Sequence, residues 1–170
     1  VDQFTNDQLE LDLLAADPSE LARIAISEGN ANRGKALFYQ SAGACFACHD
    51  PGSGAPQAGP DLKALTTSLT HEELVESILY PSKRIDKEFA QVKVLTLDGV
   101  LYTGIRVSES DDEFVLRSLA QPKPIVIKQE DIDDVVESKT SLMPANLVKA
   151  LKNRGEFNDL MKYVIEIRKR

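Results

Sequence analysis

The stretch Cys45-Phe46-Ala47-Cys48-His49 decides how the rest of this 170-residue chain is interpreted. It has the pattern C-x-x-C-H, which is typical of covalent attachment of a c-type haem. Two thiols three positions apart on one turn of helix can each form a thioether with one of the two vinyl groups of a porphyrin, and the adjacent histidine then lies over the iron. We therefore predict one covalently bound haem c, anchored by Cys45 and Cys48, with His49 as the proximal ligand.

Other interpretations of these residues stay open at this point. A redox disulfide of thioredoxin type expects a preceding hydrophobic strand, whereas residues 34–40 look helical. A structural zinc site needs four ligands, and His71 leaves the set one short unless a carboxylate joins it. Because acidic residues surround His71 in the first turn of a predicted helix, we expect it on the surface rather than on a metal. A chance occurrence of the pattern is the remaining alternative.

Charge and hydropathy limit the classes of function. The formal net charge is −7, which argues against nucleic acid as a partner because phosphate binding needs clustered Lys and Arg. An acidic electron carrier would be steered toward a basic patch on a redox partner protein; alternatively, the charge only keeps the chain soluble. We see no apolar run of membrane-spanning length and no signal-peptide pattern.

The predicted cofactor also suggests a compartment. Covalent haem is attached outside the cytoplasm, so we expect a periplasmic or otherwise extracytoplasmic location. The chain begins with Val1 rather than Met, and we interpret it as a processed or excised segment of a longer protein.

Helix signals dominate the first half of the chain. Residues 1–30 read as a helical lead-in, with a helix that begins at the cap Asp17 and ends near Gly29. A second helix is predicted over 32–42, and its Gly34 predicts the close approach of another backbone. We expect this neighbour to be the last helix, residues 157–169, which carries an apolar stripe.

Downstream of a helix capped by Thr70, the hydrophobic period changes to two. Five short strands are predicted at residues 89–97, 100–107, 114–119, 125–127 and 132–136. Asp98-Gly99 forms the predicted turn between the first two. They suggest a small antiparallel sheet or barrel, and a three-stranded sheet is the simpler alternative. Helical pattern resumes at Ala145. The expected domains are thus the lead-in, a haem-binding domain of residues 31–86 and 137–170, and a β-rich insertion of residues 87–136.

Two further residues are candidates for the haem site. A metal-bound histidine usually donates its other ring nitrogen to a carbonyl or carboxylate, and the backbone carbonyl of Pro60, in a Gly- and Pro-rich loop, is our candidate acceptor for His49. Met143 precedes Pro144, which restrains its backbone, and its soft thioether suits the distal position of the iron. A gap-filling role in the core is the alternative for Met143. The other methionine, Met161, lies in the predicted last helix.

Taken together, these residues resemble a class I cytochrome c. The shared features are Gly34 with Phe38, the Cys45, Cys48 and His49 motif, Gly59-Pro60, Met143-Pro144 and Tyr163. More narrowly, residues 31–168 resemble the haem-binding domain of planctomycete and verrucomicrobial proteins. That similarity rests on the stretches 33–38, 59–62, 78–82, 98–99, 141–144 and 159–163.

The resemblance implies a mainly α cytochrome c fold with an inserted small antiparallel β-sheet or barrel, α+β overall. It also implies that such domains often lie at the C-terminal end of large secreted proteins with dehydrogenase-like regions. The interval between His49 and Met143 is longer than in simple small cytochromes. Ligation by Met143 therefore requires that the β insertion does not displace the loop that carries it.

The function that we expect is transfer of single electrons between redox partners by one haem, without catalysis. One alternative is a haem with an open distal site that binds small ligands or catalyses a reaction. Another makes the β insertion a docking module for a dehydrogenase domain or partner subunit.

Overall fold

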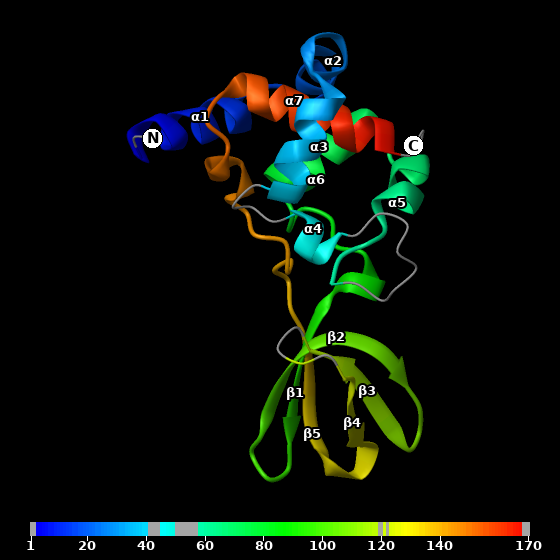
Figure 1. The fold of residues 1–170 in the computed structure, drawn as a ribbon. Coiled ribbons are helices and arrows are strands. Elements are labelled where there is room, and N and C mark those ends of the chain that lie inside the picture. The colour runs from blue at the N-terminus through cyan, green and yellow to red at the C-terminus, as the bar shows by residue number, and fades with distance from the viewer. Residues whose placement is uncertain (1–2, 41–44, 50–57, 119–120, 122, 168–170) are drawn as a thin grey trace. The chain divides into compact units, whose positions relative to one another are not determined.

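The chain divides into two compact units, which a computed structural model describes at residues 3–40, 45–49, 58–118, 121 and 123–167. The helical unit comprises Val1–Lys83 and Pro144–Arg170, and the sheet unit comprises Arg84–Met143. Figure 1 shows the helices of the first unit and the strands of the second. Each unit has its own hydrophobic core. The protein is therefore α+β, with an antiparallel sheet inserted into a helical unit, and the fold class predicted from the sequence is confirmed.

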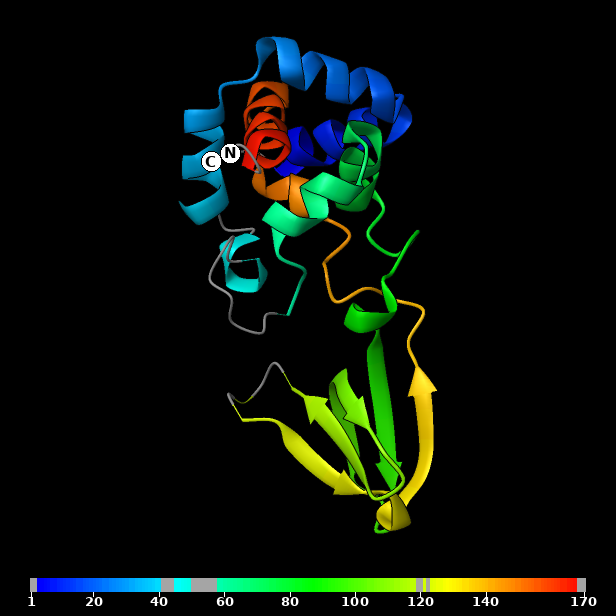
Figure 2. The same cartoon turned by 90° about the vertical axis from the view of Figure 1, so that its right-hand side faces the viewer.

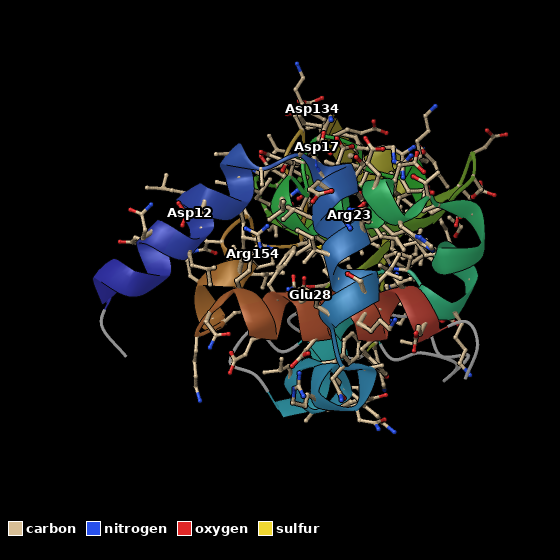
Figure 3. The ribbon with its side chains drawn as sticks, turned by 90° about the horizontal axis from the view of Figure 1, so that it is seen from above. Asp12, Asp17, Arg23, Glu28, Asp134 and Arg154 are labelled. Atoms are coloured by element: carbon tan, nitrogen blue, oxygen red, sulfur yellow. The ribbon has the colours of Figure 1, made fainter. Side chains whose placement is uncertain are left out.

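The helical unit is organised around its last helix. Helix α7 (Arg154–Glu166) packs against α2 (Pro18–Glu28) and α3 (Ala31–Gln40), and Figure 3 shows α2 crossing it, with Arg23 and Glu28 on the exposed side of α2. The remaining helices are α1 (Gln3–Ala15), α4 (Cys45–Cys48), α5 (Leu62–Ser68), α6 (His71–Leu79) and the 3-10 helix η3 (Leu147–Ala150).

Side-chain caps fix where two of these helices begin, as the sequence predicts. The carboxylate of Asp17 accepts a hydrogen bond from the Glu20 amide at 2.9 Å, and Pro18 occupies the first helical position of α2. Thr70 and Glu73 form a reciprocal capping box at the start of α6. Each cap satisfies backbone donors that would otherwise lack a partner at the helix start.

The crossing of α3 and α7 depends on a residue without a side chain. A Cβ atom built on Gly34 would overlap the carbonyl group of Asp159 and approach the Cβ of Tyr163. The predicted close approach of the last helix to Gly34 is thereby confirmed. That helix begins earlier than predicted, at Arg154, because Asn153 caps it by accepting from the Glu156 amide at 3.1 Å.

The first thirty residues belong to the helical unit. Leu13 of α1 and Leu21 of α2 are fully buried in its core, and Lys149 of η3 forms ion pairs with Asp7 and Glu10 of α1. Helical structure was predicted to resume at Ala145; it resumes as the short 3-10 helix η3, and the next α-helix is α7.

The sheet unit contains five described strands in the order β4-β3-β2-β1-β5, each antiparallel to its neighbours. They are β1 (Gln91–Thr96), β2 (Leu101–Glu109), β3 (Glu113–Arg117), β4 (Ile125–Lys128) and β5 (Ile132–Glu137). Their bounds lie within two residues of the predicted strands, and the three-stranded alternative is wrong. Gly99, with φ of 83°, occupies the turn between β1 and β2.

One core holds the sheet in a curled form (Figure 2). Val92, Val94, Phe114, Leu116 and Ile127 are its buried members, and Ile132 and Val135 of β5 pack against them. The strands β4 and β5 are the two edges of the sheet, yet residues of both contribute to the same core. The sheet is therefore a partly closed barrel and not a flat sheet.

Candidate functional site

The two cysteines lie on the single turn of α4. Side chains three positions apart on a helix face the same side, with Cβ atoms about 5–6 Å apart. Both thiols are free and partly buried, and the His49 amide continues the turn with a hydrogen bond to the Cys45 carbonyl at 2.9 Å. Cys45 also packs against the core of the helical unit. The two thiols and the imidazole therefore come from a single helical turn and the residue that directly follows it.

The environment of Cys45 bears on the redox-disulfide interpretation. Burial raises the pKa of the Cys45 thiol above its ordinary value. Redox-active cysteines have lowered pKa values because the thiolate is the reactive form. The described residues that precede α4 form the helix α3, as predicted for residues 34–40. Both observations weigh against a thioredoxin-type site.

His49 is held through one ring nitrogen. Its Nδ1 lies 2.9 Å from the carbonyl oxygen of Pro60, the acceptor expected from the sequence. A carbonyl oxygen can only accept, so Nδ1 carries the hydrogen and the lone pair is on Nε2. Burial lowers the pKa of His49, although the hydrogen bond to Pro60 opposes this shift in part. The imidazole is therefore neutral at pH 7, and the lone pair of its Nε2 is the one that could bind a metal.

A glycine packs against the ring of His49. The amide of Gly59 donates to the carbonyl oxygen of Cys48 at 3.0 Å, which ties the segment before Pro60 to α4. Gly59 is buried, and a Cβ atom built on it would overlap Cε1 of the imidazole and approach Nδ1 and Nε2. Gly59 and Pro60 together leave the imidazole little freedom to turn.

Aromatic side chains connect the motif to the core of the helical unit. The rings of Tyr39 and Phe46 lie 4.9 Å apart, and Phe38 contacts both Tyr39 at 5.2 Å and Tyr163 of α7 at 5.4 Å, between ring centroids. Phe38 and Tyr163 are buried, whereas Tyr39 and Phe46 are exposed. The position of α4 therefore depends on the packing of α3 against α7.

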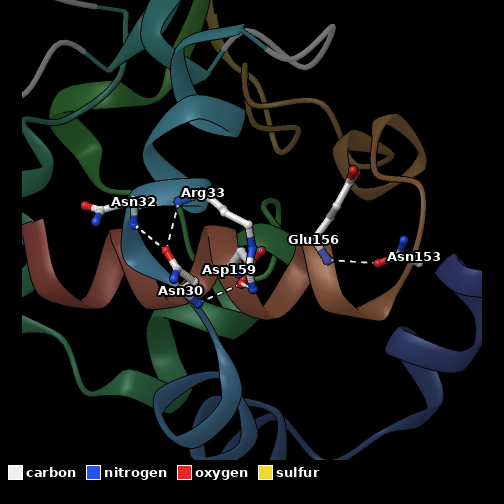
Figure 4. A network of polar contacts seen from close by, with 6 residues as sticks. All are labelled: Asn30, Asn32, Arg33, Asn153, Glu156 and Asp159. Carbon is white, nitrogen blue, oxygen red and sulfur yellow. Dashed lines mark hydrogen bonds and ion pairs between the residues drawn. The ribbon is translucent and has the colours of Figure 1, made fainter.

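A polar network fixes that packing (Figure 4). The carboxylate of Asp159, on the buried side of α7, accepts from Arg33 Nε at 2.5 Å, from Arg33 Nη2 at 2.8 Å and from the Asn30 amide at 2.6 Å. The side chain of Asn30 in turn caps α3 by accepting from the amides of Asn32 and Arg33. Burial alone would raise the pKa of Asp159, but these donors outweigh it and hold the pKa below its ordinary value.

The remaining candidates lie elsewhere in the chain. Met143 is the last residue of the sheet unit, is partly exposed, and its amide donates to Ser141 Oγ at 3.1 Å. Met161 is fully buried in the core of the helical unit. His71 occupies the first turn of α6 and is partly exposed. The structure thus brings Cys45, Cys48, His49 and Pro60 together, and Met143 belongs to the other unit.

Sequence reasoning missed two features around the site. Helix α5 was not predicted, although Asp61 caps it by accepting from the Lys63 amide at 2.8 Å. The pattern of Asp61 followed by Leu62 and Leu65 was the available signal. The buried role of Asp159 was missed as well. Among the described residues, no group of three or more His, Cys, Asp and Glu side chains gathers in a way that could hold a metal ion.

Comparison with known proteins adds no family to this description: no protein-family model matches the sequence, and no curated protein is significantly similar to it. None of the helices in the described part of the chain combines the length and apolarity that a membrane span needs.

Proposed function

We propose that this chain is a mono-haem c-type cytochrome that carries single electrons between redox partner proteins outside the cytoplasm. The observation that supports this most strongly is the hydrogen bond between His49 Nδ1 and the Pro60 carbonyl beside the two free thiols of α4. It orients a neutral imidazole with Nε2 as the available donor atom, which is the state that a haem iron requires.

The residues present fit a covalently held haem. Cys45 and Cys48 are unpaired thiols on one side of a turn, so both can become thioethers to a single flat group. Gly59 packs its backbone against the imidazole and restricts the orientation of the ring. Bound haem supplies a one-electron couple between ferric and ferrous iron. The protein residues supply attachment, one fixed ligand and a partly buried environment.

Met143 is the proposed second ligand. A thioether favours ferrous iron and raises the reduction potential relative to a second histidine. The hydrogen bond from its amide to Ser141 Oγ, together with Pro144, restrains the backbone on both sides of Met143. The resemblance to class I cytochromes c, and to the haem-binding domain of planctomycete and verrucomicrobial proteins, agrees with this assignment and with fusion to a larger secreted dehydrogenase.

The proposal is tested by producing the chain with the c-type cytochrome maturation machinery. Mass spectrometry should then show one haem added to the polypeptide and resistant to denaturation. A polypeptide that folds but carries no covalent haem would refute the proposal. A high-spin spectrum of a covalent haem would instead support the alternative, an open distal site that binds small ligands.

A further inference from the structure

One side of α3 continues onto α4 as an exposed surface. Asn32, Lys35, Ala36 and Tyr39 recur at the spacing of one helical face, and all of them are exposed. Phe46 and Ala47 of α4 are exposed too. We call the surface formed by Lys35, Ala36, Tyr39, Phe46 and Ala47 the α3–α4 face.

The centre of the α3–α4 face is aromatic. Tyr39 is 40% exposed and Phe46 is 43% exposed, and their rings are tilted by 43° with centroids 4.9 Å apart. Phe38, which is buried, supports Tyr39 from the core side. Supported aromatic side chains with small neighbours are typical of the centre of a protein interface, since they bury much area and lose little freedom.

The charge of this face is opposite to that of the whole chain. Helices α3 and α4 contain Arg33 and Lys35 and no carboxylate, in a chain of net charge −7. Arg33 is neutralised by Asp159. Lys35 forms no ion pair with any described residue, and it adds a positive charge at the edge of the aromatic pair. A negative partner is therefore favoured here, although the net charge alone would favour a positive one.

We propose that the α3–α4 face is where the redox partner docks, and that this partner presents carboxylates around an apolar contact. The inference rests on the proposed function, because Phe46 lies between the two cysteines that would hold the haem. A partner seated on Phe46 and Tyr39 is next to the attachment turn, and Lys35 at the rim steers its approach. The charge that matters for association is the local one, not the total.

The test uses the holoprotein and two small redox probes of opposite charge. Ferrous protein is oxidised by ferricyanide, which takes one electron and becomes ferrocyanide, or by tris(phenanthroline)cobalt(III), which becomes cobalt(II). Stopped-flow rate constants are measured between low and moderate ionic strength. The rate with ferricyanide should fall as salt is added and the rate with the cobalt complex should rise, because only a locally positive surface attracts the anion.

Two variants with the same change in net charge separate a local from a global effect. Lys35→Glu reverses the charge on the α3–α4 face, and Lys152→Glu reverses an exposed charge just before α7. At low salt, Lys35→Glu should slow ferricyanide about ten-fold, for a charge reversal roughly 10 Å from a trivalent ion, and Lys152→Glu less than about two-fold. Equal effects of the two variants, or a ferricyanide rate that rises with salt in the unaltered protein, would overturn the inference.

A binding measurement supplies a readout besides electron transfer. Titration of the ferrous holoprotein with poly-L-glutamate, followed by amide NMR, should shift the signals of Lys35, Tyr39 and Phe46, and Lys35→Glu should abolish the shifts. Shifts confined to other helices would contradict the docking face. Absence of covalent haem would contradict the proposed function itself, whereas a normal haem with charge-independent kinetics would contradict only the docking inference.

Discussion

Replacing Gly59 with Ala perturbs the imidazole without removing any ligand. The new Cβ would overlap Cε1 of His49, so either the ring or the segment containing Gly59 must move. Overpacking of a buried position costs about 1–3 kcal/mol. A weakened hydrogen bond from His49 Nδ1 to Pro60, now 2.9 Å, adds about 1 kcal/mol. The reduced freedom of the unfolded chain offsets about 0.4–1 kcal/mol.

We therefore expect Gly59→Ala to lower the free energy of unfolding by about 1–3 kcal/mol. In the holoprotein it should also alter the low-spin spectrum and the midpoint potential, because the imidazole is no longer held in its original orientation. The assays are urea denaturation followed by circular dichroism and redox titration followed by absorbance.

Gly155→Ala is the matched control. Gly155 lies in the first turn of α7, and among the described residues its added Cβ would meet only the Asn153 side chain, at 3.1 Å. Its stability should change by no more than about 1 kcal/mol and its potential not at all. If Gly59→Ala leaves stability and potential as Gly155→Ala does, the close packing of Gly59 on His49 does not fix the ring.

Three other changes test separate parts of the structure. Met143→Ala should abolish the weak far-red absorption of a sulfur-to-iron bond and lower the midpoint potential; an unchanged spectrum would mean that Met143 is not a ligand. Cys45→Ser should leave one thioether, seen by mass spectrometry as a haem still attached through Cys48, whereas an unaltered two-thioether spectrum would contradict the assignment of Cys45. Asp159 has a pKa below its ordinary 3.8, so its stabilising contribution is complete above about pH 4 and is lost as the pH falls through the lowered value. Asp159→Asn should lower the free energy of unfolding by about 1–3 kcal/mol at pH 7 and should reduce its further loss at acidic pH, both measured by denaturation at several pH values. If the variant loses stability with falling pH as steeply as the unaltered protein, another group is responsible for the acid dependence.

Local chemistry explains which parts of the fold the sequence predicts well. The starts of α2 and α6 could be predicted from Asp17 and Thr70 because an N-cap involves only residues within one turn of the helix. The five strands are predicted nearly at their observed bounds because alternation and the Asp98-Gly99 turn are also local signals. The choice between five strands and three depends on which strands pair, and that was settled only by the structure.

Other features depend on partners that are distant in the sequence. Asp159 looks like an ordinary polar residue of an amphipathic helix until Arg33 and the Asn30 amide are seen beside it. The placement of residues 1–30 depends on which residues bury Leu13 and Leu21, and a local sequence pattern cannot predict those partners. The hydrogen bond from His49 to Pro60 was expected because metal-bound histidines follow a general rule for their second nitrogen.

The central claim is that Cys45, Cys48 and His49 hold a haem. It is tested most directly by the absorption spectrum of the protein produced with the c-type maturation machinery, recorded as the reduced pyridine complex after denaturation. The proposed function predicts one haem per chain with the spectrum of a two-thioether haem c. A folded chain without haem, or with haem that is extracted by acidic organic solvent, would contradict it.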